Sequence, residues 1–276
     1  MNLHMHKGGL ISVITACYNS ASTIERALQS VANQDWPHVE HILIDGASTD
    51  GTMAVIERFR SRLACVVSEP DDGIYDAMNK GLARATGDVV CFLNADDQYV
   101  SDKVLSIVAN QMHANQLDAL MGDVSFFHAS NPNRQVRRYR SDRFTPARLA
   151  WGWMPAHPAL FLTRPVVDRV GRFNTTYKIA GDYEFIIRAF YGHALRYAHV
   201  PMVLVRMQTG GVSTDGWRAK VLLNKEVLRA CRENGVRTNM LKILSKYPAK
   251  LFELLPSWGL STGNEGVSQH KNRKAI

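Results

Sequence analysis

The chain has 276 residues, 46% of them hydrophobic, and a formal net charge of +8. This length and apolar content allow a substantial buried core, in one large domain or one domain with an appendage, and argue against a disordered chain. The four cysteines show no CxxC spacing, which argues against a zinc site or a disulfide framework. No apolar run approaches the ~18 residues that span a bilayer, and the N-terminus lacks the apolar core of a signal peptide, so we expect a cytoplasmic protein.

Three strand–helix units follow one another in the first hundred residues. Apolar, β-branched runs predict strands at residues 10–17, 41–44, 63–67 and 89–93. The helices between them are predicted from apolar residues at helical spacing, which are Ile24, Ala27, Leu28 and Val31, then Val55, Ile56 and Phe59, then Tyr75, Met78 and Leu82. A capping box over residues 22–25 should open the first helix. This alternation implies right-handed crossovers and a mostly parallel sheet.

The second half of the chain is less regular. A helix at residues 102–113 and an apolar segment at 118–127 continue the domain, and the Trp- and Pro-rich residues 151–158 predict a pocket wall. A helix is expected after Gly181, with Phe185, Ile186, Ala189 and Phe190 on one face. A mobile loop is expected at residues 209–213, then two basic helices, the second divided at Pro248, and a disordered tail over residues 259–276.

The positive charge is concentrated in two stretches. Residues 218–250 hold nine Lys or Arg against two Glu, and residues 134–148 hold six Arg. Such patches favour anionic partners, which can be phosphates, lipid headgroups or nucleic acid. In the C-terminal stretch, apolar and Lys stripes suit either a membrane surface or an ordinary helix face packed on the domain.

An acidic cluster follows the fourth predicted strand. Asn94, Asp96 and Asp97 place two acids and an amide in four positions, at the strand edge where open α/β sheets bind ligands. These oxygen ligands suit a hard cation, Mg²⁺ or Mn²⁺, that carries a diphosphate. A helix N-cap is the simpler alternative, but capping requires only one such residue.

Other polar residues at strand ends can be interpreted in two ways. The turn at residues 15–19 and Asp45 leave neighbouring strands, where they can hold a nucleobase, with the Asp45 carboxylate accepting from a ring N–H. Turn and capping roles explain Asp45 and the turn at residues 71–73 equally well, and Lys80 can be an ordinary helix end. Asp182 lies at a helix start, where a carboxylate also interacts favourably with the helix dipole.

Four segments, taken in chain order, resemble the nucleotide-sugar-binding half of glycosyltransferase family 2. They are Thr15-Ala16-Cys17-Tyr18-Asn19, residues 45–52, residues 79–87 and Asn94-Ala95-Asp96-Asp97. The resemblance covers about residues 10–206 and implies a GT-A fold, a Rossmann-like α/β/α sandwich with a mostly parallel central sheet. Residues 10–100 would form the nucleotide-sugar-binding half and 101–206 the acceptor-facing half, followed by the loop and helical extension of residues 207–258.

The resemblance also implies roles for individual residues. Asp96 matches the metal-binding position of the DXD motif, with Asn94 in place of the first Asp, and Asp182 matches the catalytic base, with glycine where the family has Glu. Thr15, Tyr18, Asn19 and Asp45 match contacts to the base and ribose, and Lys80 matches a donor contact. The whole expected donor site is Thr15, Ala16, Tyr18, Asn19, Asp45, Gly46, Asp72, Lys80, Asn94, Ala95 and Asp96.

The resemblance therefore implies an inverting, metal-dependent hexosyltransferase of cell-surface polysaccharide biosynthesis. Its donor would be a nucleotide-diphosphate sugar, with a UDP-sugar favoured, and its acceptor a saccharide or a polyprenyl-diphosphate-linked saccharide. The rival interpretation is a non-catalytic nucleotide-binding module or a nucleic-acid-binding one. Acidic strand ends and an Arg-rich stretch without regular aromatic interleaving argue against nucleic acid. A nucleotidyltransferase would need a Gly-rich, basic phosphate loop, which residues 18–21 do not provide.

Overall fold

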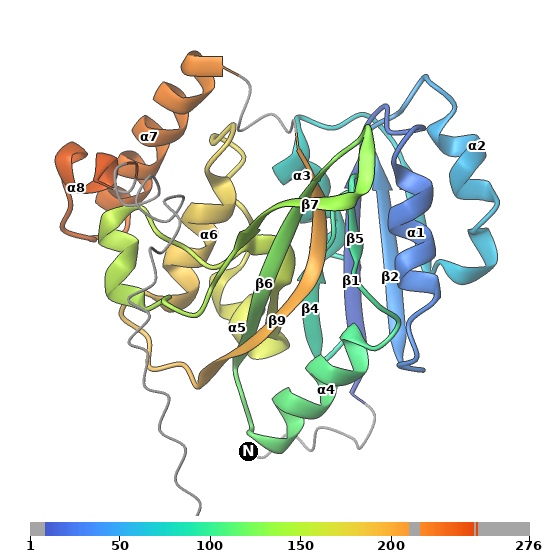
Figure 1. The fold of residues 1–276 in the computed structure, drawn as a ribbon, viewed down its shortest axis with the longest axis horizontal. Helices are drawn as coiled ribbons and strands as arrows, with labels where there is room; N and C mark the ends of the chain where they lie inside the picture. The colour runs from blue at the N-terminus through green and yellow to red at the C-terminus, as the bar shows by residue number, and fades with distance from the viewer. Residues whose placement is uncertain (1–8, 210–215, 246, 248–276) are drawn as a thin grey trace, which may run out of the picture.

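Strands and helices alternate through the first hundred residues, as the apolar pattern predicts (Figure 1). The computed structural model describes residues 9–209, 216–245 and 247. In the first half the elements are β1 (Ile11–Cys17), α1 (Ile24–Ala32), β2 (Val39–Asp45), α2 (Thr52–Glu57), η1 (Arg60–Arg62), β3 (Cys65–Ser68), α3 (Ile74–Leu82), β4 (Val89–Phe92), β5 (Asp97–Tyr99) and α4 (Val104–Ala114). In the second half they are β6 (Ala119–His128), β7 (Asn131–Tyr139), η2 (Pro146–Trp151), η3 (His157–Ala159), β8 (Leu160–Thr163), α5 (Arg164–Val170), α6 (Gly181–Phe190), β9 (Tyr197–Gln208), α7 (Gly216–Glu233) and α8 (Met240–Leu244).

The strands form one nine-stranded sheet in the order β3-β2-β1-β4-β8-β6-β9-β5, with β7 paired to β6. The four strands of the predicted units, β1 to β4, are parallel to one another. The sheet as a whole is mixed, because β8 runs antiparallel to both β4 and β6, and β5 is antiparallel to β9. An apolar run predicts that a strand is buried but does not predict the direction of that strand. The antiparallel pairing of β5 and β8 could therefore not be predicted from the sequence.

Helices cover both faces of the sheet, and β1 shows why. Its alternate residues Ile14 and Ala16 pack with α3, α5, α6 and α7, whereas Ile11 and Val13 pack on the opposite face with α4. All seven residues of β1 are buried. The sheet is thus the middle layer of an α/β/α sandwich, and its carboxyl-end loops lie at one edge between the two helical layers (Figure 1).

The predicted helical faces are confirmed in α1, where all four apolar residues are buried. In α3, Tyr75 and Met78 are buried while Leu82 is partly buried. The predicted capping box is wrong: no side chain caps α1, because the Thr23 hydroxyl donates instead to the Ser20 carbonyl.

The C-terminal helices are basic, as expected. Val227 and Cys231 of α7 are buried, whereas Trp217 is 70% and Leu241 of α8 is 81% exposed. Within the described residues, no helix is long and apolar enough to cross a membrane. Contact with a membrane surface stays a prediction, and residues 210–213, Pro248 and the predicted tail lie outside the described residues.

Gly81 provides a test of the packing between α3 and β1. A Cβ at this position would lie 2.4 Å from Cγ2 of Ile14, a stiff β-branched side chain in the core. Alanine gains about 1 kcal/mol of helix propensity over glycine, but overpacking costs about 1–3 kcal/mol. We therefore expect Gly81→Ala to lower the free energy of unfolding measured in urea. Ala83→Ser, at an exposed position just beyond the helix, should change it by less than about 0.5 kcal/mol; equal stability of the two variants would contradict this packing.

Candidate active site

The polar ends of β1, β2 and β3 meet at one edge of the sheet. Cys17 pairs with Asp45, and Asp45 with Ser68, in the parallel register. The Asp45 carboxylate is fully buried and accepts hydrogen bonds from the Ser48 backbone at 3.0 Å and from the Ser68 hydroxyl at 2.7 Å. Its oxygens hold the loop after β2, and the expected hydrogen bond from a nucleobase stays a prediction.

Thr15 lies deeper in the sheet, and its expected contact with the donor stays a prediction. Its side chain is fully buried, and its hydroxyl lies 3.0 Å from Nε2 of His41 on β2. Burial lowers the pKa of His41 to about 4, so this imidazole is neutral at pH 7. Thr15 and the buried Ala16 therefore belong to the core of the sheet, and the accessible residues of this turn are Tyr18 and Asn19.

Three residues from three different loops meet beside this edge. A Cβ at Gly46 would lie 2.5 Å from a carboxylate oxygen of Asp71 and 3.4 Å from the ring of Tyr18, so only glycine leaves room here. Tyr18 is 63% exposed. This meeting point of an aromatic ring, an open backbone and a carboxylate is suited to a nucleoside.

Asp71, and not the predicted Asp72, faces this point. Its carboxylate also accepts from the Gly73 backbone at 2.9 Å, while Asp72 is exposed. Two adjacent acids in one turn look alike in sequence, and only the turn geometry separates them. Asn19 links the first two loops, since its backbone donates to the Ser48 hydroxyl and its side-chain oxygen accepts from Thr49.

Lys80 stabilises the turn that carries Asp71. Its ammonium donates to the Pro70 carbonyl at 2.7 Å and pairs with Glu69 at 3.1 Å and Asp76 at 3.5 Å. Lys80 thus tethers α3 to the loop before it, and the expected donor contact stays a prediction.

The acidic cluster follows β4 as predicted. Asp96 is partly buried, and burial raises its pKa, while the positive charge of Arg26 on α1 opposes the shift. Arg26 was not foreseen, because no local pattern connects it with a cluster 70 residues away. Asn94 is partly exposed and Ala95 is buried.

Asp97 is 1% exposed, and neither of its carboxylate oxygens makes a hydrogen bond within the described part of the chain. Burial and the neighbouring Asp96 charge raise its pKa well above the ordinary value. The described residues contain no group of three metal-ligating side chains. A Mg²⁺ or Mn²⁺ ion that arrives with a diphosphate needs only one or two protein carboxylates, so the oxygen donors of Asn94 and Asp96 fit such an ion.

Asp182 lies in the first turn of α6. Burial, the largest cause, raises its pKa to about 6, and the negative charge of Glu226 acts in the same direction. The Tyr183 backbone donates to its carboxylate at 2.8 Å. The preceding Gly181 packs on Tyr75 so closely that a Cβ would lie 2.7 Å from the ring, which explains why no glutamate stands there.

Glu226 of α7 fixes the backbone that leads into Asp182. Its buried carboxylate accepts hydrogen bonds from three consecutive backbone N–H groups, those of Lys178, Ile179 and Ala180, each at 2.9 Å. The Tyr75 hydroxyl donates to the Ile179 carbonyl from the opposite side at 2.7 Å. The approach to α6 is thus held between α3 and α7.

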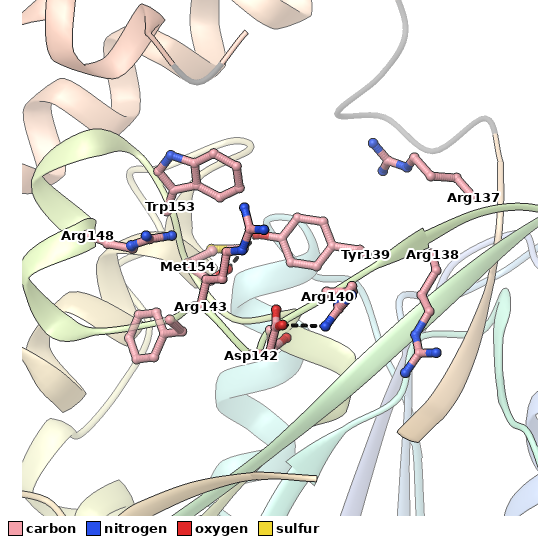
Figure 2. A pocket seen from close by; sticks show the side chains of 11 residues that line it. Arg137, Arg138, Tyr139, Arg140, Asp142, Arg143, Arg148, Trp153 and Met154 are labelled. Atoms are coloured by element: carbon pink, nitrogen blue, oxygen red, sulfur yellow. Dashed lines mark hydrogen bonds and ion pairs between the residues drawn. The ribbon is translucent and has the colours of Figure 1, made fainter. Parts of the chain in front are cut away.

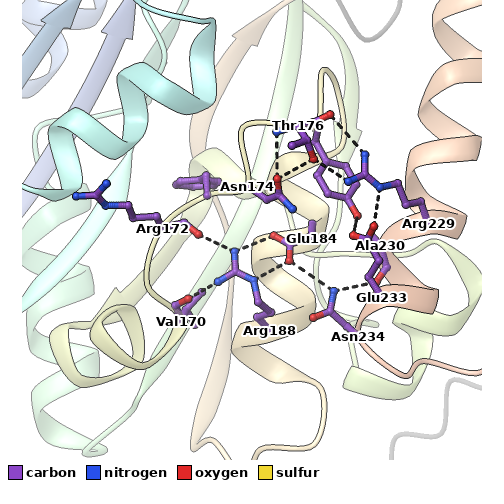
Figure 3. Close-up of polar contacts among 12 residues, drawn as sticks. Val170, Arg172, Asn174, Thr176, Glu184, Arg188, Arg229, Ala230, Glu233 and Asn234 are labelled. Atoms are coloured by element: carbon purple, nitrogen blue, oxygen red, sulfur yellow. Dashed lines mark hydrogen bonds and ion pairs between the residues drawn. The ribbon is translucent and has the colours of Figure 1, made fainter.

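Further polar contacts fix the rest of this loop (Figure 3). Arg188 of α6 pairs with Glu184 at 2.7 Å and donates to the Arg172 carbonyl at 2.8 Å. Arg229 of α7 pairs with Glu233 and donates to the Thr176 hydroxyl, both at 2.7 Å. Residues 170–180 are therefore tied to two helices at several points.

An aromatic cluster connects β4 with α6. Phe173 and Phe185 stack at a centroid distance of 4.2 Å, and Phe92 contacts both edge-on. His157 stacks on Phe92 at 5.1 Å, and burial lowers its pKa to about 4. His157 is therefore a neutral part of the wall, while the cluster fixes the strand before Asn94 against the helix that carries Asp182.

A parallel sheet edge rich in carboxylates, together with a helix that begins at a half-buried carboxyl group, is the arrangement expected of a GT-A type of glycosyltransferase. The family model described as glycosyl transferase family 2 matches residues 12–172. The PGL/p-HBAD biosynthesis glycosyltransferase of Mycobacterium bovis (strain BCG) is 31% identical over 226 residues, which cover 80% of this chain and 83% of that protein. The chain belongs to glycosyltransferase family 2.

Solved structures share the fold at low sequence identity. S. aureus TarS 1-349 in complex with UDP-GlcNAc matches with a TM-score of 0.64 and 21% identity, covering 89% of this chain and 73% of that 1-349 chain. The mannosyltransferase PcManGT from Pyrobaculum calidifontis, in complex with GDP-Man and Mn²⁺, matches with a TM-score of 0.57 and 19% identity, covering 90% and 81%. The GT-A fold expected from the sequence is thus confirmed.

The clamp made by Glu226 can be tested through stability. Glu226→Ala removes the acceptor of three backbone N–H groups, and each unsatisfied buried donor costs about 1–3 kcal/mol. We expect the free energy of unfolding in urea to fall by more than about 2 kcal/mol. Glu57→Ala, which removes an exposed helix glutamate, should cost less than about 0.5 kcal/mol. Similar losses in both variants would show that the three hydrogen bonds do not hold the loop.

Proposed function

We propose that this protein is an inverting glycosyltransferase that moves a sugar from a nucleoside-diphosphate donor to a hydroxyl group of a saccharide or lipid-linked saccharide. The observation that carries the proposal is the half-buried Asp182 carboxyl group at the start of α6, whose pKa is raised to about 6. A base with a pKa just below neutral is ionised at pH 7 and still accepts a proton effectively. Family membership supports the same chemistry.

In the proposed reaction, the Asp182 carboxylate takes the proton of the acceptor hydroxyl as its oxygen attacks the anomeric carbon. The bond from that carbon to the diphosphate breaks, its electron pair leaves with the diphosphate, and the configuration inverts in a single displacement. The loop clamped by Glu226 keeps the carboxylate in position for this proton transfer.

We assign the nucleoside to the point where Tyr18, Gly46 and Asp71 meet, with Tyr18 offering its exposed ring for stacking. Asp96, with Asn94 beside it, is the proposed holder of Mg²⁺ or Mn²⁺. When bound, this ion would neutralise negative charge on the departing diphosphate. A UDP-sugar is the first donor to test, since TarS was solved with UDP-GlcNAc, and GDP is the alternative, since PcManGT was solved with GDP-Man.

Nucleotide binding tests the donor site. A thermal-shift panel of UDP, GDP, dTDP and CMP, each with and without Mn²⁺, should show stabilisation by one diphosphate that depends on Mn²⁺. A ligand at 100 times its Kd stabilises by about 2.7 kcal/mol. Asp96→Ala should remove the Mn²⁺-dependent part, whereas Asp168→Asn, at a 64% exposed side chain on α5, should leave it unchanged. No stabilisation by any nucleotide would refute the proposal and leave the nucleic-acid-binding module as the alternative.

Asp182→Asn tests the base. General-base catalysis contributes about 10²–10⁴-fold, so sugar transfer, or release of sugar to water, should fall by that factor while donor affinity stays close to that of the native protein. Activity of the native protein should decline as the pH falls below about 6, where Asp182 becomes protonated. Loss of donor binding together with activity would count against the assignment.

The same variant has a readout that needs no substrate. The folded pKa of Asp182 lies above the ordinary 3.8, so the folded state holds a proton that the unfolded state releases between about pH 4 and 6. The contribution of Asp182 to native stability therefore falls as the pH rises through this range. Asp182→Asn should be more stable than the native protein above pH 6, by on the order of 2 kcal/mol, and not below pH 4.

A further inference from the structure

A basic cavity lies between β7 and η2, and none of the site residues described above lines it (Figure 2). Its volume is about 310 Å³, at the lower end of the range for small-molecule sites. Its charged lining residues are Arg137, Arg138, Arg140, Arg143, Arg148 and a single carboxylate, Asp142. In Figure 2, Arg143 and Arg148 lie beside Trp153 and Tyr139, whereas Arg137 lies further along β7.

The charge balance of this cavity favours an anion. Arg140 pairs with Asp142 and Arg138 with Asp123, both at 2.6 Å, so carboxylates of the protein compensate part of the positive charge. Arg140, Arg143 and Arg148 still gather around one concavity, and a multivalent anion would relieve the repulsion between their guanidinium groups. The planar fork of a guanidinium matches phosphate oxygens in a bidentate way.

The walls of the cavity are held by hydrogen bonds and packed side chains, so the cavity is more than a cluster of surface arginines. The Tyr139 hydroxyl donates to the Met154 carbonyl at 2.6 Å, which joins the end of β7 to the segment after η2. Trp153 is half-buried at the rim and Phe144 is buried behind it. An aromatic ring beside guanidinium groups suits a ligand that carries both an anion and an apolar or sugar face.

The cavity is also connected with Asp182. The side chain of Tyr183, the next residue along α6, donates a hydrogen bond to the Leu149 carbonyl in η2. Arg148 precedes Leu149, so one buried contact joins the cavity wall to the first turn of α6. An anion bound in the cavity would therefore be held on the same rigid support as the proposed base.

We propose that this cavity binds a phosphate or diphosphate group of the acceptor, and so selects phosphorylated acceptors. The role as an acceptor subsite rests on the proposed function, whereas the binding of a phosphate does not. The group can belong to a prenyl-linked saccharide or to a water-soluble sugar phosphate, since both present the same oxygens.

Calorimetric titration of the full chain with inorganic pyrophosphate tests the site. The titration is done in EDTA, so that metal-assisted binding at the donor edge is removed. The native protein should bind pyrophosphate, and the double variant Arg143→Gln/Arg148→Gln should bind it roughly tenfold or more weakly, because hydrogen bonds between charged partners are the strong class. Arg60→Gln/Arg62→Gln, which removes two exposed arginines around η1, is the control matched in charge and should bind normally.

Two further ligands distinguish the sources. Tighter binding of farnesyl diphosphate than of pyrophosphate would indicate a prenyl-linked acceptor. Tighter binding of glucose 1-phosphate than of pyrophosphate would indicate a soluble acceptor. Either result supports the cavity if the double variant binds that ligand more weakly than the native protein does. The single variant Arg148→Gln is the control for misfolding. Its melting temperature should equal that of the native protein, while its binding of pyrophosphate should be weaker. Equal affinity of native and double variant, or no binding of any of the three ligands, would overturn the proposal. Nucleotide binding with Mn²⁺ should survive in the double variant, so that failure here is distinct from failure of the donor site.

Discussion

The position of the proposed base depends on one carboxylate in a distant helix. Glu226 accepts from three consecutive backbone N–H groups immediately before α6, and without it this loop would leave those donors unsatisfied in a largely apolar layer. The same charge helps to raise the pKa of Asp182, so a single residue both orders the loop and tunes the acid within it. Both α6 and α7 lie beyond residues 12–172, the part that matches the family model.

At the ends of β1, β2 and β3, where we propose that the donor binds, most polar side chains make hydrogen bonds within the protein. Asp45 and Lys80 are engaged by protein partners in the loops where Tyr18, Gly46 and Asp71 come together, and Thr15 is engaged in the core of the sheet. Few polar side chains at this edge are accessible to a ligand, and buried polar side chains hold the loops that carry them. The loops of the proposed donor site are thus fixed by internal hydrogen bonds, and the proposal predicts little reordering when a nucleotide binds.

The sequence predicts the first half of the fold well because each β/α unit buries its own periodic face, as in α1. It also predicts the acidic edge, since parallel strands place their carboxyl ends together. The sequence does not predict which of Asp71 and Asp72 faces Gly46. It also does not predict which carboxylates, such as that of Asp45, accept hydrogen bonds from the protein. Both properties depend on the geometry of the loops. Glu226 and Arg26 were missed because they reach the site from 44 and 70 residues away in the chain, across helices whose local patterns carry no such information. Strand direction in the second half of the sheet is likewise set by tertiary packing.

A crystal structure of the protein with a nucleoside-diphosphate sugar and Mn²⁺ would test the account most directly. The account predicts the base against Tyr18, Gly46 and Asp71, the metal ion on Asp96, and the anomeric carbon of the sugar turned toward Asp182. A nucleotide bound away from this edge, or a sugar whose anomeric carbon faces away from Asp182, would contradict it.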